Sequence, residues 1–181
     1  MEEWTANPAL RIHMEAVAAC MDAYAQKMAP DERERWVVAG LLHDFDYEKH
    51  PTQEEHPFVG VEHLRTLGVD EEVTTAILGH AEYSGTPRES LMAKVLFGVD
   101  ELAGFIVACV KVRPDGIDSL APKSVKKKLK DKSFAAAVNR DDIRQGVEGL
   151  GVDLTEHIQT CIDALRSEAE RLGLAAGKSE V

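Results

Sequence analysis

The segment from Glu89 to Val110 is long and strongly apolar, and it limits the folds that the chain can adopt. It lacks the alternation of polar and apolar residues that marks a half-buried strand, so we expect one long helix that crosses the core. A carboxylate, Asp100, follows the apolar run 95–99 inside this segment. Burying an unpaired charge is costly, so a carboxylate at this position needs a compensating partner.

Helical patterns also cover most of the remaining chain. Asn7-Pro8 is a typical helix start, and Asp31 is placed to cap the following helix. Together with the apolar segment, the predicted helices span residues 8–28, 32–44, 58–67, 70–80, 89–110, 123–132, 141–150 and 154–172. We therefore predict an all-α fold, a compact bundle of seven or eight helices with no sheet of consequence.

Length and composition narrow the classes of protein to consider. The 181 residues are enough for one domain with a substantial core. No apolar run approaches the roughly 20 residues of a membrane helix. The acidic N-terminus lacks the basic start and apolar core of a signal peptide, so we expect a cytoplasmic protein without a membrane partner. The cysteines are far apart in the sequence and are expected to be buried thiols: Cys20, Cys109 and Cys161.

The net charge of −11 makes nucleic acid an improbable partner. The charge is unevenly distributed, because residues 111–140 hold nine basic and three acidic residues, which leaves −17 for the rest of the chain. This basic segment, densest at 123–132, has two interpretations. It either attracts an anionic substrate locally or forms a solvated lysine-rich helix. The sequence indicates no oligomeric state.

The dipeptide His43-Asp44 directly follows an apolar run and is the strongest sign of function. A divalent metal compensates such a pair, because it binds neutral imidazole and ionised carboxylate together. Other candidate ligands come from several predicted helices, an arrangement by which helical proteins build metal sites. The full predicted ligand set is His13, His43, Asp44, His56, His80 and Asp100.

Each candidate ligand also has a structural interpretation when taken alone. His13 is also compatible with the role of a hydrogen-bonded core histidine, and His56 is compatible with that of a helix cap. His80 would interact favourably with the C-terminal end of its helix. Asp100 would form an ion pair with a Lys or Arg of another helix. Their occurrence together, in this order, favours the metal site.

The order of these residues resembles the HD-domain superfamily of metal-dependent phosphohydrolases. The signature is a His, then His-Asp, then a distant Asp, and it matches His13, His43-Asp44 and Asp100. His56 and His80 are similar to the additional histidines of members that bind two metal ions. The resemblance implies a helical metal-binding core at 9–113 within a single domain, 1–181, and we expect residues 114–173 to form a helical extension.

This resemblance implies hydrolysis of a nucleotide or a small phosphoester or phosphoanhydride by a metal-activated water. One or two divalent ions (Mn, Fe, Co, Ni or Zn, with Mg also possible) would serve as cofactor, since the ligands are nitrogen and oxygen. Asp44 and Asp100 are the candidate catalytic carboxylates. Cations suit a phosphoryl group, and the candidates for substrate binding are Lys94, Lys111 and Arg113. The alternative function is a metal-binding regulatory or ligand-sensing module with little turnover.

The sequence departs from the superfamily pattern at two places. Eleven residues separate Asp44 from His56, a shorter gap than is usual in two-metal members. Phe45-Asp46 stands where Ile-Gly often follows the His-Asp pair. Asp46 is either a supporting or catalytic carboxylate or an exposed loop residue, and the second interpretation is the preferred one.

Overall fold

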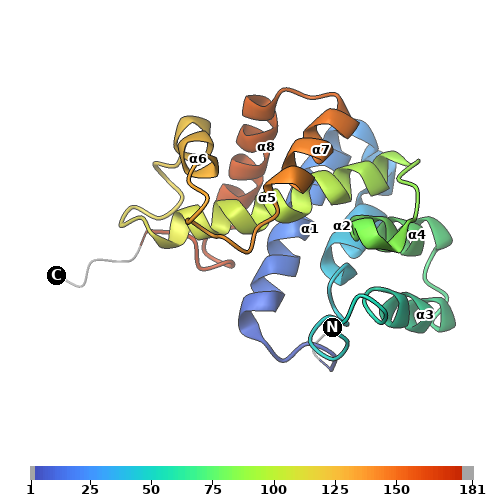
Figure 1. The fold of residues 1–181 in the computed structure, drawn as a ribbon. Coiled ribbons are helices and arrows are strands. Elements are labelled where there is room, and N and C mark those ends of the chain that lie inside the picture. The colour runs from blue at the N-terminus through green and yellow to red at the C-terminus, as the bar shows by residue number, and fades with distance from the viewer. Residues whose placement is uncertain (1–2, 177–181) are drawn as a thin grey trace.

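The computed structural model describes residues 3–176, and this part of the chain consists of helices joined by turns and loops (Figure 1). It contains eight α-helices and two short 3-10 helices, at Pro30–Glu32 and Glu82–Ser84. The α-helices are α1 (Pro8–Met28), α2 (Arg33–Leu42), α3 (Phe58–Thr66), α4 (Glu71–His80), α5 (Leu91–Lys111), α6 (Pro122–Leu129), α7 (Arg140–Leu150) and α8 (Leu154–Ser167). The prediction of an all-α bundle of seven or eight helices is confirmed.

Helix α5 is the centre of the packing. It lies against α1, α4, α7 and α8 (Figure 1). Its side chains Leu96, Leu102, Phe105 and Ile106 have no exposed surface. Burying a side chain of this size stabilises a fold by roughly 1.5–3 kcal/mol, so α5 holds the surrounding helices in place. The polar side chains of the site project from this framework.

The N-terminal caps explain where several helices begin. The side chain of Asn7 accepts a hydrogen bond from the Ala9 amide at 2.9 Å, and Asp70 caps α4 in the same way. The predicted cap at Asp31 is wrong, because Pro30 starts a 3-10 turn and α2 begins only at Arg33, without a side-chain cap.

Helix α2 is also shorter than predicted at its C-terminal end. It ends at Leu42, and residues 43–49 form a series of tight turns. One of these turns is closed by a 3.0 Å hydrogen bond from the Tyr47 amide to the Asp44 carbonyl. His43 and Asp44 therefore follow α2 rather than ending it, and the turns direct both side chains towards α5.

Helix α8 is joined to the core by His157. This buried imidazole contacts the Tyr24 hydroxyl of α1 through Nδ1, and its Nε2 donates to the Gly98 carbonyl of α5 at 2.8 Å. Burial lowers the pKa of His157, which favours the neutral ring.

The three cysteines are buried free thiols, as predicted. None of the helices in residues 3–176 combines the length and the apolar character that crossing a membrane requires.

Candidate metal centre

Six polar side chains converge beside the middle of α5. One comes from α1, one ends α4, one lies midway along α5, and three lie between α2 and α3. They are the six ligands predicted from the sequence: His13, His43, Asp44, His56, His80 and Asp100. They form two groups of three, and within each group the potential ligand atoms lie within 4.8 Å of one another.

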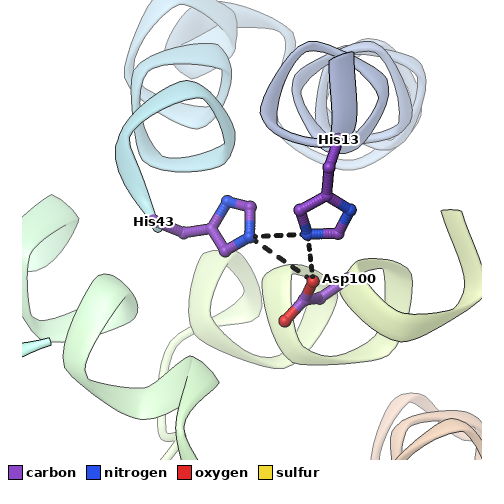
Figure 2. Close-up of side chains that lie close together, drawn as sticks. All are labelled: His13, His43 and Asp100. Atoms are coloured by element: carbon purple, nitrogen blue, oxygen red, sulfur yellow. Dashed lines mark hydrogen bonds and ion pairs between the residues drawn. The ribbon is translucent and has the colours of Figure 1, made fainter. Parts of the chain in front are cut away.

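The first group is formed by His13, His43 and Asp100. Figure 2 shows the two imidazole rings turned towards each other and towards the carboxylate of α5. The His13 Nε2 lies 3.1 Å from the His43 Nε2 and 3.0 Å from the Asp100 Oδ1. The His43 Nε2 lies 3.4 Å from the same oxygen. Two ring nitrogens and one carboxylate oxygen thus surround a single small volume.

The second group is formed by Asp44, His56 and His80. The Asp44 Oδ1 lies 3.3 Å from the His56 Nε2 and 3.2 Å from the His80 Nε2. The other oxygen, Oδ2, lies 3.4 Å from the His43 Nε2 and 3.6 Å from the His13 Nε2. The two oxygens of Asp44 therefore face different groups, and this carboxylate joins the two halves of the centre.

The outer ring nitrogens fix how the histidines face the centre. The Nδ1 of His43 donates to the Gly40 carbonyl at 2.8 Å, and the Nδ1 of His80 donates to the Ile77 carbonyl. A carbonyl only accepts, so each Nδ1 carries the hydrogen and the Nε2 of the neutral ring presents a lone pair. Lone pairs that face one another beside two carboxylates fit a divalent cation bound by nitrogen and oxygen.

The pKa shifts of the histidines and carboxylates are consistent with a centre that binds a cation. Burial opposes a charge on His43, but the carboxylates Asp44 and Asp100 outweigh burial and hold its pKa well above the usual value. Burial likewise opposes ionisation of these two carboxylates. Nearby imidazoles, His43 foremost, outweigh it and lower both carboxyl pKa values. The His56 pKa is raised to about 9 because Asp44 and Asp46 outweigh its burial. The carboxylates thus stabilise positive charge at the centre.

Asp46 supports His56 from behind, so its interpretation as an exposed loop residue is wrong. The Asp46 side chain is buried, because the segment between α2 and α3 folds back over it. Its Oδ1 accepts a 2.8 Å hydrogen bond from the His56 Nδ1, and its Oδ2 accepts one of 2.8 Å from the Gly60 amide. A β-carbon on Gly60 would lie 2.6 Å from the Asp46 carboxyl carbon, so glycine makes this contact possible.

A family model described as HD domain matches residues 10–104, which is more than half of the chain. The chain belongs to the HD-domain family. No curated protein sequence and no solved structure matches it significantly. HD domains bind divalent metal ions and are generally metal-dependent hydrolases, and the paired histidine and aspartate groups are the part of this chain suited to hold metal.

The candidate metal centre of this HD domain opens into a cleft of about 430 Å³. A volume of this order suits a small ligand. Beyond the centre itself, the cleft is lined by Tyr47, Gln53, Ala81, Glu82, Tyr83, Phe97, Glu101, Asn139 and Asp142. Among these described residues there is no Lys and no Arg.

The three predicted substrate-binding cations do not line this cleft. Lys94 lies in a neighbouring cavity with Gln145 and Glu148. Lys111 is the last residue of α5, about 16 Å along the helix from Asp100 at 1.5 Å per residue. Arg113 follows it and donates to the Ser119 hydroxyl at 2.6 Å. Helix α5 thus leads Lys111 and Arg113 away from the candidate metal centre, towards the lysine-rich helix α6 (Figure 1).

Several residues of the cleft wall were not predicted from the sequence. Burial and the neighbouring Asp100 raise the pKa of Glu101 to about 7. Burial, followed by Glu82 and Asp100, raises the pKa of Asp142. Glu101 directly follows a predicted ligand, and that position was a usable signal. Asp142 had none, because its place depends on how α7 packs beside the HD core.

Proposed function

We propose that this protein is a metal-dependent phosphohydrolase that uses two divalent cations to hydrolyse a small phosphoester. The position of Asp44 carries the proposal, because its two oxygens face two separate groups of imidazole nitrogens. Under this proposal, His13, His43 and Asp100 hold one cation, and His56 and His80 hold the other. Asp44 would contribute one oxygen to each group.

The chain's own residues orient the reactants. A bound divalent cation supplies Lewis acidity, which lowers the pKa of water and offsets charge on phosphoryl oxygens. Asp100 directs Oδ1 at the imidazoles, which leaves Oδ2 to accept a hydrogen bond from the attacking water. The carbonyls of Gly40 and Ile77 keep two rings in the metal-binding orientation.

The donor set also bears on the identity of the metal. Four imidazole nitrogens and two carboxylates, without a thiolate, favour Mn, Fe, Co, Ni or Zn over a cation that prefers oxygen alone. The buried cysteines lie in the helical core and supply no ligand to either group. We therefore expect the purified protein to retain a first-row transition metal in preference to Mg.

Replacing Asp44 by Asn tests the proposal, because Asn preserves the volume of the side chain and removes its charge. Elemental analysis should find two divalent ions per wild-type chain and fewer in Asp44→Asn. Hydrolysis of small phosphomonoesters should fall by more than about 100-fold. Removing a residue that only supports a metal ligand usually costs about 10–100-fold, and Asp44 is itself a proposed ligand. Asp118→Asn changes an exposed carboxylate outside the centre and should preserve both properties. Unchanged metal content and activity in Asp44→Asn would refute the proposal.

A further inference from the structure

The cleft above the metal centre is acidic, which is unexpected for a site that receives a phosphoryl group. Beyond the histidines of the centre, its wall carries Glu82, Glu101 and Asp142 and, among the described residues, no Lys or Arg. Arg88, which contacts Glu82 and Phe97 of this wall, is already engaged. It forms an ion pair with Glu82, donates to the Gly79 carbonyl at 2.9 Å, and stacks 3.7 Å from the Phe97 ring centre. Arg88 thus compensates Glu82, which leaves Glu101 and Asp142 as the acidic groups of the wall.

This wall disfavours a substrate with several phosphates. With one phosphoryl group at the histidine and aspartate groups, any further phosphate would lie in the cleft that Glu101 and Asp142 line. Like charges repel strongly where protein excludes part of the solvent. The same wall attracts positive charge on the remainder of the substrate.

The aromatic residues at the cleft give an independent indication of a cationic group. Tyr47 and Tyr83 both line it and remain 45% and 44% exposed, although large aromatic side chains are usually more buried. The Tyr47 ring stands edge-on to the His56 ring, with the ring centres 5.1 Å apart, which places it beside the metal centre. Exposed aromatic faces next to carboxylates bind ammonium groups through cation–π attraction.

We propose that the cleft selects a phosphomonoester whose alcohol carries an ammonium group. Its phosphoryl group lies at the histidine–aspartate centre, and its ammonium group lies between the tyrosines and the Glu101–Asp142 wall. In the reaction, water forms a bond to phosphorus as the ester P–O bond breaks. The departing alkoxide gains a proton, and the products are inorganic phosphate and an amino alcohol. This inference rests on the proposed phosphohydrolase function.

Phosphocholine and dimethylbutyl phosphate form a matched pair of test substrates, because carbon replaces the quaternary nitrogen in the second. With metal-loaded protein, kcat/KM should be at least about tenfold higher for phosphocholine, the effect of one cation–π contact with partial desolvation. Added salt should reduce this preference, because it screens the wall. ADP should be a poorer substrate than either monoester.

Asp142→Asn should reduce the ratio of the two kcat/KM values, because it removes one negative charge from the wall. Glu148→Gln is the matched control: it lies on the same helix, is exposed and pairs with Arg144, and should preserve the ratio. Equal turnover of the two monoesters, or faster turnover of ADP, would overturn the inference and leave the phosphohydrolase function standing. Absence of turnover with every phosphoester would overturn both.

Discussion

At the scale of single residues, the link between Asp46 and His56 decides how one half of the metal centre is held. The buried Asp46 carboxylate accepts from the His56 Nδ1 and from the Gly60 amide, each at 2.8 Å. These bonds fix the ring so that its Nε2 faces Asp44. A carboxylate behind a ligating histidine also raises the basicity of the ring, so under the proposed function Asp46 would act on the metal through His56.

Asp46→Asn should weaken binding of the cation proposed at His56 and His80 by about 10–100-fold, the usual loss when such a supporting carboxylate is removed. The amide has only one acceptor oxygen and cannot serve both donors. Gly60→Ala should have a similar effect, because its new methyl group displaces Asp46. Metal titration of the apo-protein measures both. Glu54→Gln alters an exposed carboxylate of the same segment and serves as control; equal losses in all three variants would contradict this role.

The six candidate ligands were predictable as a set, because their order in the sequence favours a metal site and two of their signals are distinctive. His43-Asp44 follows an apolar run, and Asp100 interrupts the core helix. The supporting residues carry no such signal. An aspartate in a polar segment, such as Asp46, has the same appearance whether it is buried or solvated. The path of the chain from α2 to α3 decides between these states, and local pattern does not determine that path.

At the scale of elements, the contact between α5 and α7 sets the position of the cleft wall. Gly98 of α5 and Gly146 of α7 lie so close that a β-carbon on Gly146 would be 2.6 Å from the Gly98 α-carbon. Helix α7 carries Asp142, and the side chain of Asn139 caps its first turn. Both residues line the cleft. The glycine contact therefore positions the wall relative to Asp100.

Gly146→Ala should destabilise the protein by about 1–3 kcal/mol, because the added methyl group meets backbone rather than a flexible side chain. Gly149→Ala is the matched control. It lies on the exposed side of the same helix with no atom within 4 Å of a new β-carbon, and should stabilise by about 0.5–1 kcal/mol through helix propensity. Urea unfolding measures both changes. Equal effects at the two positions would show that helix propensity, not close packing, governs α7.

At the scale of the whole molecule, the metal site joins segments that are far apart in the sequence. The family match ends at residue 104, yet α7, which begins at Arg140, supplies part of the cleft wall. Periodicity and capping residues predicted the helices, because those signals are local. The three cations predicted to bind substrate lie outside the cleft, because residue type alone does not show which way a side chain faces along α5 or where the chain runs beyond it.

Metal binding should therefore stabilise the entire fold, since it joins α1, α4, α5 and the segment after α2. A cation at 100 times its dissociation constant adds about 2.7 kcal/mol to the free energy of unfolding. A chelator should remove this stabilisation, which thermal unfolding with and without chelator measures. Coincident unfolding curves under the two conditions would show that metal does not join these elements.

The size of this metal effect should depend on pH. In the metal-free protein the His56 pKa is about 9, against 6.5 for an ordinary histidine. The stability that protonated His56 contributes is fully present below pH 6.5 and is lost as pH rises through about 9. Metal binding must displace that proton, so the increase in unfolding temperature caused by metal should grow from pH 6.5 to about 9. His56→Asn should flatten this dependence, whereas His50→Asn, in the same segment but outside the centre, should preserve it. A metal effect independent of pH in the wild type would mean that His56 loses no proton when metal binds.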